Sequence, residues 1–268
     1  MRSLSRAFVA GALSLLLVSS ALAQADKYTK HEYMIPMRDG TKLYTAVYVP
    51  KDKPGELPIL LERTPYSAGP YGTQQKGGHR GSQKFKDAGY IFAYQDVRGK
   101  YMSEGEFVDV RPNRLFYHSP ADTDESTDTY DTIEFLINNV PQNNKRVGMW
   151  GISYPGFYAG VGATHSHPAL KASSPQAPVS DWFLGDDFHH NGAFFVWDYF
   201  KFMINFGQPR PEPTATPKRG PRIDYKGDAY QFFLDLGPLS NIEKFYYKDQ
   251  VQYWKDFQAH PHYDEWWQ

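Results

Sequence analysis

The sequence contains no cysteine, although it runs to 268 residues. Disulfide bonds, a thiolate nucleophile and thiolate-bound metals are therefore excluded, and stability must come from a packed core. Neither positive nor negative charge dominates, because the sequence has 29 lysines and arginines and 30 aspartates and glutamates. This balance gives no indication of a nucleic acid or an anionic membrane surface as a partner.

A long membrane-spanning run is also missing, and the one apolar stretch at the start is typical of a targeting signal. Residues 1–23 contain two arginines, Arg2 and Arg6, before an apolar run from Ala7 to Val18, and end in Ala21-Leu22-Ala23. This order predicts a secretory signal peptide cleaved before Gln24. A membrane anchor is the alternative, but the run is short for a span. We therefore expect an exported protein, periplasmic or extracellular, with no membrane association after cleavage.

The following part of the chain alternates strand and helix patterns. Residues 33–50 alternate apolar and polar side chains around Asp39-Gly40, which predicts an antiparallel hairpin. Short apolar runs typical of buried strands lie at 57–67, 89–101, 146–153 and 169–182, and helical patterns lie at 123–140 and 156–167. This order predicts an α/β fold, with a mainly parallel sheet covered by helices on both faces.

The character of the sequence changes after about residue 183. Residues 185–206 are rich in aromatics with a helical pattern, whereas residues 207–222 contain five prolines and no apolar periodicity. The second stretch predicts a loop or flexible connector. Shorter helical patterns continue to the end of the sequence. We expect residues 24–182 to form the N-terminal part of the main domain and residues 183–268 to be a helical cap inserted over the sheet.

A sharp strand-to-helix turn is predicted around Ser153, in the stretch "RVGMWGISYPG". Gly151 and Gly156 flank the serine, as in a nucleophile elbow, although the second glycine comes one place later than is usual. Pro155 falls in the first helical turn, where a missing N–H is tolerated. A helix N-cap is the alternative role for Ser153. The combination with an α/β order favours a nucleophilic serine with the Tyr154 N–H as an oxyanion donor.

Three motifs in order extend this interpretation: "RTPYS" at 63–67, "DVRGKYMSEGEF" at 96–107, and "GISYPG". Together they resemble the family of cocaine esterase, α-amino acid ester hydrolases, glutaryl acylases and X-prolyl dipeptidyl peptidases. The resemblance covers about residues 33–206. It implies an α/β-hydrolase fold, a serine hydrolase that works by acyl transfer, and no cofactor or metal. Substrates are then small esters, amides or short peptides.

The same resemblance implies roles for individual residues. Ser153 matches the nucleophile, and Tyr66 matches the tyrosine whose hydroxyl completes the oxyanion hole beside the Tyr154 N–H. Without the resemblance, a core tyrosine at the end of a strand is the preferred interpretation of Tyr66. Asp96, Arg98 and Gly99 match a structural motif, in which we expect a buried Asp–Arg pair that holds a loop and has no catalytic role.

Substrate recognition is predicted at "GDDFHHNGAF", residues 185–194. This segment is similar to one in α-amino acid ester hydrolases, where an aspartate at the position of Asp187 belongs to a carboxylate cluster that binds the α-ammonium group. An anionic pocket suits an ammonium ion. The alternative is that Asp186 or Asp187 caps the helix expected to open at the two histidines that follow.

The sequence up to residue 268 offers no favoured candidate for the catalytic base of Ser153 or for the acid that pairs with this base. In this fold the order is nucleophile, acid, histidine, and the resemblance implies that the last two come after residue 268. The chain is then expected to be the N-terminal part of a longer hydrolase, inactive alone. A less favoured hypothesis recruits His260 or His262, for which only Asp264 or Glu265 is near as an acid.

Other functions stay open at this point. X-prolyl dipeptidyl peptidase activity and plain carboxylesterase activity are alternatives within the same family. A secreted binding protein would keep the fold without hydrolysis. A metal site at the "HSH" of 165–167 or the "HPH" of 260–262 is disfavoured, because spacing alone brings no further ligands together.

Overall fold

The structure is a computed structural model that describes residues 27–79, 83–185, 187–225 and 227–267. The predicted signal peptide, residues 1–23, lies outside the described residues. The chain divides into two compact units, Met1–Pro178 and Val179–Gln268. None of the helices in the described ranges has the length and apolar character needed to cross a membrane.

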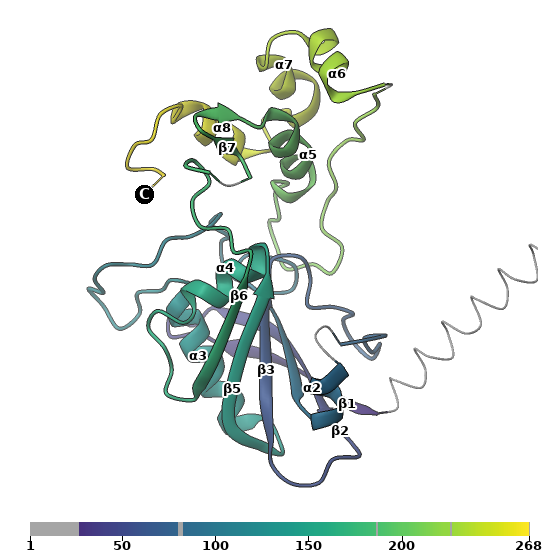
Figure 1. The fold of residues 1–268 in the computed structure, drawn as a ribbon, viewed down its shortest axis with the longest axis vertical. Helices are drawn as coiled ribbons and strands as arrows, with labels where there is room; N and C mark the ends of the chain where they lie inside the picture. Colours follow the sequence, from purple (N-terminus) through teal and green to yellow (C-terminus); the bar gives the residue numbers. More distant parts are fainter. Residues whose placement is uncertain (1–26, 80–82, 186, 226, 268) are drawn as a thin grey trace, which may run out of the picture. The chain divides into compact units, whose positions relative to one another are not determined.

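The first unit is built on one six-stranded sheet (Figure 1). Its strands are β1 (Tyr28–Pro36), β2 (Lys42–Pro50), β3 (Leu57–Thr64), β4 (Ile91–Asp96), β5 (Asn143–Ile152) and β6 (Leu170–Gln176). The order across the sheet is β1-β2-β4-β3-β5-β6. The pairs β4–β3, β3–β5 and β5–β6 are parallel, while β1–β2 and β2–β4 are antiparallel. The predicted mainly parallel sheet is confirmed.

Both predicted features of the opening hairpin are present. β1 and β2 pair antiparallel in a register that sets Pro36 opposite Lys42. Gly40 has a φ of 85°, a conformation that glycine adopts without strain, and its N–H donates to the Met37 carbonyl at 2.8 Å. The Asp39-Gly40 pair thus correctly predicted a turn, and a backbone hydrogen bond within the turn stabilises it.

The two faces of the sheet are covered differently. On one face, the long helix α3 (Glu125–Asn139) and the short helix α4 (Tyr154–Val161) pack on an aliphatic cluster. Its members include Ile59, Leu61, Ile91, Ala93, Ile133, Leu136, Val147, Met149 and Ala159. The other face carries an aromatic cluster of Tyr44, Tyr48, Leu60, Phe92 and Tyr94. Tyr90 joins this cluster and contacts Phe85 of α2 (Gln83–Ala88) at 5.0 Å between ring centroids.

The second unit contains a two-residue hairpin and a group of helices. β7 (His189–His190) pairs with β8 (Ala193–Phe194), and α5 (Val196–Phe206) follows. The prediction that the two histidines open a helix is wrong, because they form a strand and the helix begins six residues later. The remaining elements are α6 (Ala229–Leu236), α7 (Ser240–Ile242), the π-helix η1 (Glu243–Tyr247) and α8 (Gln252–Ala259).

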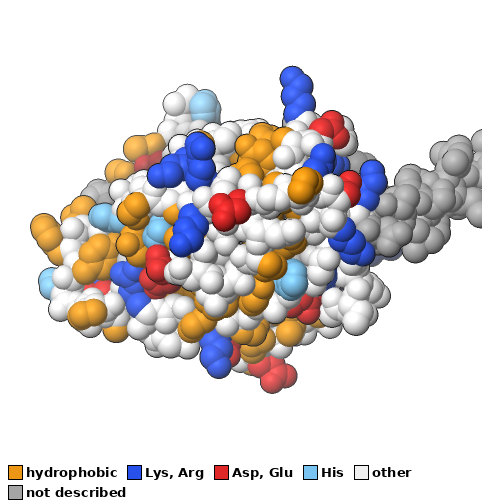
Figure 2. Space-filling view, turned by 90° about the horizontal axis from the view of Figure 1, so that it is seen from below, with side chains coloured by type: hydrophobic (Ala, Val, Ile, Leu, Met, Phe, Trp, Pro, Cys, Tyr) orange, Lys and Arg blue, Asp and Glu red, His pale blue; other side chains and the backbone are white. Residues whose placement is uncertain are grey.

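Aromatic side chains form the interior of this second unit. Buried rings from α5, α6, η1 and α8 pack on one another, among them Tyr199, Phe200, Phe232, Tyr247 and Trp254. Residues 207–222 contain neither helix nor strand, as the prolines predict. On the face of the molecule drawn in Figure 2, basic and acidic side chains are interspersed, in agreement with a formal net charge of −1.

Candidate active site

The predicted nucleophile, Ser153, lies at the carboxyl end of a parallel strand, where α/β proteins usually bind their ligands. β5 ends at Ile152 and α4 begins at Tyr154, so Ser153 is the single residue between strand and helix (Figure 1). Its neighbour β3 is parallel to β5 and ends at Thr64, two residues before Tyr66. The carboxyl ends of parallel strands meet at one edge of the sheet, which is the usual place for substrate.

The backbone of Ser153 is strained in the way a nucleophile elbow requires. Its φ is 63° and its ψ is −124°, a combination that non-glycine residues rarely adopt. The side chain makes no capping hydrogen bond to α4 and the residue is exposed. The interpretation of Ser153 as an N-cap is therefore wrong for its side chain. The Ser153 N–H donates to the Gln176 carbonyl of β6 at 3.0 Å, which fixes the turn to the sheet.

The two flanking glycines are explained by close backbone approaches. A β-carbon on Gly151 would lie 2.1 Å from the Pro155 carbonyl oxygen, inside the first turn of α4. A β-carbon on Gly156 would lie 2.6 Å from the Gln176 carbonyl oxygen of β6. Both contacts are shorter than van der Waals distance, so neither position accepts a side chain without a backbone shift. The glycine that comes one place late in the sequence is needed where α4 crosses β6.

Tyr66 lies beside the elbow and is not a core residue. Its side chain is 43% exposed. Its ring meets the ring of Tyr154 edge to face, with centroids 6.2 Å apart and planes at 87°. The structure therefore brings Tyr66 to the residue that follows Ser153, whereas the alternative of a buried core tyrosine is wrong.

Tyr154 is anchored by its own side chain. Its ring is buried and stacks on Tyr158, and its hydroxyl donates to Asp109 Oδ1 at 2.7 Å. The same hydroxyl accepts the Val110 N–H at 2.7 Å. Burial, followed by the nearby Asp109 carboxylate, raises the pKa of the Tyr154 hydroxyl well above its usual value. As the first residue of α4, Tyr154 has its N–H at the positive end of the helix dipole.

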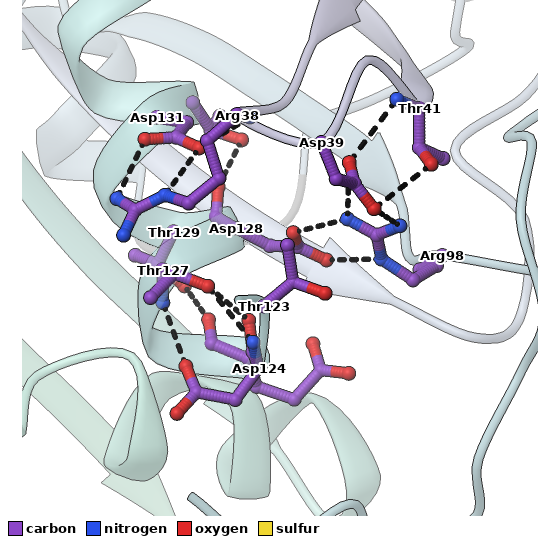
Figure 3. A network of polar contacts seen from close by, with 12 residues as sticks. Arg38, Asp39, Thr41, Arg98, Thr123, Asp124, Thr127, Asp128, Thr129 and Asp131 are labelled. Carbon is purple, nitrogen blue, oxygen red and sulfur yellow. Dashed lines mark hydrogen bonds and ion pairs between the residues drawn. The ribbon is translucent and has the colours of Figure 1, made fainter. Parts of the chain in front are cut away.

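Asp96 and Arg98 hold loops, but they do not do so by pairing with each other. Arg98 forms ion pairs at 2.7 Å with Asp39 from the β1–β2 turn and with Asp128 from α3 (Figure 3). Asp96 accepts hydrogen bonds from the Ala68 N–H at 2.6 Å and from the Tyr71 hydroxyl at 2.9 Å. The predicted Asp–Arg pair is thus wrong, because strand order brings partners from distant parts of the chain closer.

The two histidines that follow Ser153 in the first unit, His165 and His167, have partners on helix α3. His165 Nδ1 lies 3.2 Å from Ser126 Oγ, and His167 Nε2 lies 2.8 Å from Glu134 Oε2. Helix α4 ends at Val161, so the predicted helix over 156–167 is too long and both histidines follow it.

The second unit contains the predicted substrate-binding aspartate. Asp187 is exposed and directly precedes Phe188 and β7. It does not cap the following helix, since α5 begins at Val196 with Phe195 at its N-cap; Asp186 lies outside the described residues. His260 Nδ1 lies 2.7 Å from Asp264 Oδ2, so this histidine has the acid partner that the sequence offered. Within the described ranges, no three His, Asp or Glu residues are grouped so as to hold a metal ion.

The elbow, its glycines and the adjacent tyrosine make a comparison with known families informative. A family model described as X-Pro dipeptidyl-peptidase (S15 family) matches residues 39–268. The chain belongs to the S15 family. The resemblance drawn from the three motifs is thereby confirmed.

Relatives of this S15-family chain include enzymes acting on esters and peptides. It is 31% identical over 166 residues to cocaine esterase of Rhodococcus sp. (strain MB1 Bresler), covering 61% of this chain and 26% of the relative. Among solved structures, an aminopeptidase from the marine sediment archaeon Thaumarchaeota archaeon is 35% identical with a TM-score of 0.75. An α-amino acid ester hydrolase labelled with selenomethionine is 36% identical with a TM-score of 0.74.

Each of these two structural comparisons covers 90% of this chain and 39% of the solved chain. The S15-family chain therefore spans about two fifths of the length of the structures it matches. Together with the mainly parallel sheet, the likenesses confirm the predicted α/β-hydrolase fold.

One residue of this S15-family site was missed by the sequence reading. Asp109 lies two residues after the motif at 96–107, and no sequence pattern around it indicates a role in the site. Burial raises the pKa of its carboxyl group to about 6, although the hydrogen bond from Tyr154 acts in the opposite direction. Only the folded structure shows that Asp109 bonds to the residue next to the nucleophile.

Proposed function

We propose that the protein is a serine hydrolase that cleaves ester or amide bonds by two-step acyl transfer, with Ser153 as the nucleophile. The observation that carries the proposal is the conformation of Ser153, with its strained backbone and exposed, non-capping side chain between strand and helix. A nucleophile on such a turn projects above the sheet edge, where a substrate carbonyl is able to approach.

In the proposed reaction, Ser153 Oγ attacks the substrate carbonyl carbon and gives up its proton to a base. The negative charge that forms on the carbonyl oxygen is stabilised by the Tyr66 hydroxyl and the Tyr154 N–H. The tetrahedral intermediate expels the alcohol or amine, which takes up a proton, and water then releases the acid from the acyl-enzyme. The base and its acid partner stay predictions.

The test is covalent labelling of the whole gene product with a fluorophosphonate. We expect one adduct, located on Ser153 by mass spectrometry, and none in the Ser153→Ala variant. A matched control is Ser174→Ala, on β6, which should label like the wild type. A folded protein without an adduct, or an adduct on another serine, would contradict the proposal.

For the substrate, we propose α-amino acyl groups, with Asp187 binding the ammonium. The support is the similarity to an α-amino acid ester hydrolase and the exposed carboxylate of Asp187. Hydrolysis of glycine methyl ester is compared with hydrolysis of methyl acetate, in the wild type and in Asp187→Asn. A preference for the amino ester that falls at least tenfold in the variant supports the role. Equal rates for both esters would indicate a plain carboxylesterase.

X-prolyl dipeptidyl peptidase activity is the second candidate, favoured by the family match over residues 39–268. It is separated from the first by an X-Pro p-nitroanilide, which only the peptidase cleaves efficiently. We also propose export, which the pattern of residues 1–23 supports. Intact mass of the secreted protein should then show an N-terminus at Gln24, and a retained Met1 would contradict this.

A further inference from the structure

The segment from Asp96 to Val110 begins at the last residue of β4, and its residues 97–110 form no helix or strand. It is nevertheless held firmly. Arg98 is anchored by its two ion pairs, and Gly99 N–H donates to the Glu104 carbonyl at 2.9 Å. A β-carbon on Gly99 would lie 2.0 Å from the Phe107 nitrogen, so the segment folds back tightly on itself. Gly99 is therefore in close backbone contact with residues 104–107.

At its first end, Asp96 fixes the loop that carries Tyr66. The carboxylate is fully buried, and it accepts the Ala68 N–H at 2.6 Å and the Tyr71 hydroxyl at 2.9 Å. Ala68 is two residues from Tyr66, and the intervening Ser67 has a φ of 95°. The same carboxylate accepts the Met102 N–H at 3.2 Å, which ties the Tyr66 loop to the 96–110 segment.

At its second end, the segment fixes the first turn of α4. The Tyr154 hydroxyl donates to Asp109 and accepts from Val110, so its position is defined on two sides. Val110 has a φ of 42°, a strained value for a β-branched residue. Strain of this kind persists only where surrounding contacts stabilise it. The contact with the Tyr154 hydroxyl is one of them.

From this geometry we infer that Asp96 and Asp109 are positioning residues for the oxyanion hole, acting through Tyr66 and Tyr154 respectively. One folded segment sets the distance between the two oxyanion donors, because each of its ends is bonded to the element that carries one donor. The inference rests on the proposed function. Oxyanion donors stabilise the transition state only when held at hydrogen-bond distance from the developing charge.

The test is a pair of double-mutant cycles in the whole gene product, with kcat/KM for p-nitrophenyl acetate as the readout. We expect Asp96→Asn to lower kcat/KM about tenfold in the wild type but less than about twofold in a Tyr66→Phe background. In the second cycle, Asp109→Asn and Tyr154→Phe should each cost about tenfold, and their combination should cost no more than one alone. Asp131→Asn, which alters only a surface pair with Arg38, is the matched control and should retain full activity.

A structural role alone predicts the opposite pattern. If Asp96→Asn lost the same factor in both backgrounds, or if the Asp109 and Tyr154 effects multiplied, the inference would be overturned. If Asp96→Asn does not fold, the second cycle decides, since Tyr154→Phe keeps the ring and its packing. A wild-type protein that hydrolyses no ester and is not labelled by fluorophosphonate would contradict the proposed function, and the positioning role would fail with it. An active wild-type protein in which the effects of the paired variants on kcat/KM multiply would contradict only the positioning role.

Discussion

The rings of Tyr66 and Tyr154 meet edge to face with their centroids 6.2 Å apart, although 88 positions separate them in the sequence. The contact follows from the parallel pairing of β3 and β5, whose carboxyl ends deliver the two residues to the same place. It brings the Tyr66 side chain to Tyr154, the residue that follows Ser153 and begins helix α4. An oxyanion hole requires such a pair of donors near the nucleophile.

The first prediction concerns the Tyr66 hydroxyl. Tyr66→Phe should lower kcat/KM for an activated ester by about 10²–10³, or about 2.7–4 kcal/mol, the usual loss for one oxyanion donor. KM should change little, because the hydrogen bond strengthens only in the transition state. The control is Tyr33→Phe on the edge strand β1, whose ring packs on Phe135. An unchanged kcat/KM for Tyr66→Phe would remove this residue from the mechanism.

The second prediction compares two glycines of β5. Gly151→Ala introduces a β-carbon 2.1 Å from the Pro155 carbonyl oxygen, so the elbow must shift. We expect a loss of at least about 1–3 kcal/mol in the free energy of unfolding, together with loss of Ser153 labelling. Gly148→Ala places its β-carbon 3.6 Å from Leu60 Cδ1, an ordinary contact, and should label normally. Urea denaturation and fluorophosphonate labelling measure both effects, and similar behaviour of the two variants would refute the steric argument.

The third prediction concerns the cap of α3. Asp124 accepts the Thr127 N–H at 2.9 Å and returns its own N–H to Thr127 Oγ1, a reciprocal cap (Figure 3). Burial opposes ionisation, but hydrogen bonds, that from the Tyr117 hydroxyl foremost, lower the pKa of Asp124 to about 2. Asp124→Ala should therefore cost about 1–2 kcal/mol at pH 7.

The pH dependence of this loss follows from the sign of the shift. A carboxyl group whose folded pKa is lowered stabilises the fold above its unfolded pKa, and this stabilisation disappears as pH falls through the folded value. The difference between the wild type and Asp124→Ala should thus shrink between pH 4 and pH 2. Asp131→Ala, on the same helix but in a surface pair with Arg38, should cost less than about 1 kcal/mol. A difference that stays constant with pH would show that the carboxylate charge plays no part.

The fourth prediction concerns Asp96, whose pKa is shifted upward, so that the pH dependence of stability is opposite to that for Asp124. Burial raises its pKa from 3.8 to about 6, against the hydrogen bonds that it accepts. Between these values the unfolded chain loses a proton that the folded protein keeps, so stability falls as pH rises. The free energy of unfolding of the wild type, relative to Asp96→Asn, should fall by about 2 kcal/mol from pH 4 to pH 6. Urea titrations across this range measure it, and a flat difference would show that Asp96 ionises normally.

Local sequence patterns were enough to predict the order of β1 to β6 with α3 and α4, the turn at Gly40, and the elbow with its two glycines and Pro155, whereas α2, β7 and β8 were not predicted. These features are local, because alternation, apolar runs and turn residues act over a few positions. Local patterns misled where tertiary contacts decide, as at His189 and His190, which form a strand and not the start of a helix. Likewise, α4 stops at Val161 after two turns, earlier than its small-residue pattern predicts.

Partner choice among the polar side chains was decided only by the tertiary structure. Arg98 pairs with Asp39 and Asp128 because the sheet order and the docking of α3 bring these three elements together. Asp109 reaches Tyr154 because its segment folds back at Gly99. A side chain bonds to whatever the fold places within about 3 Å, and sequence spacing does not encode that distance when the partners lie on different elements.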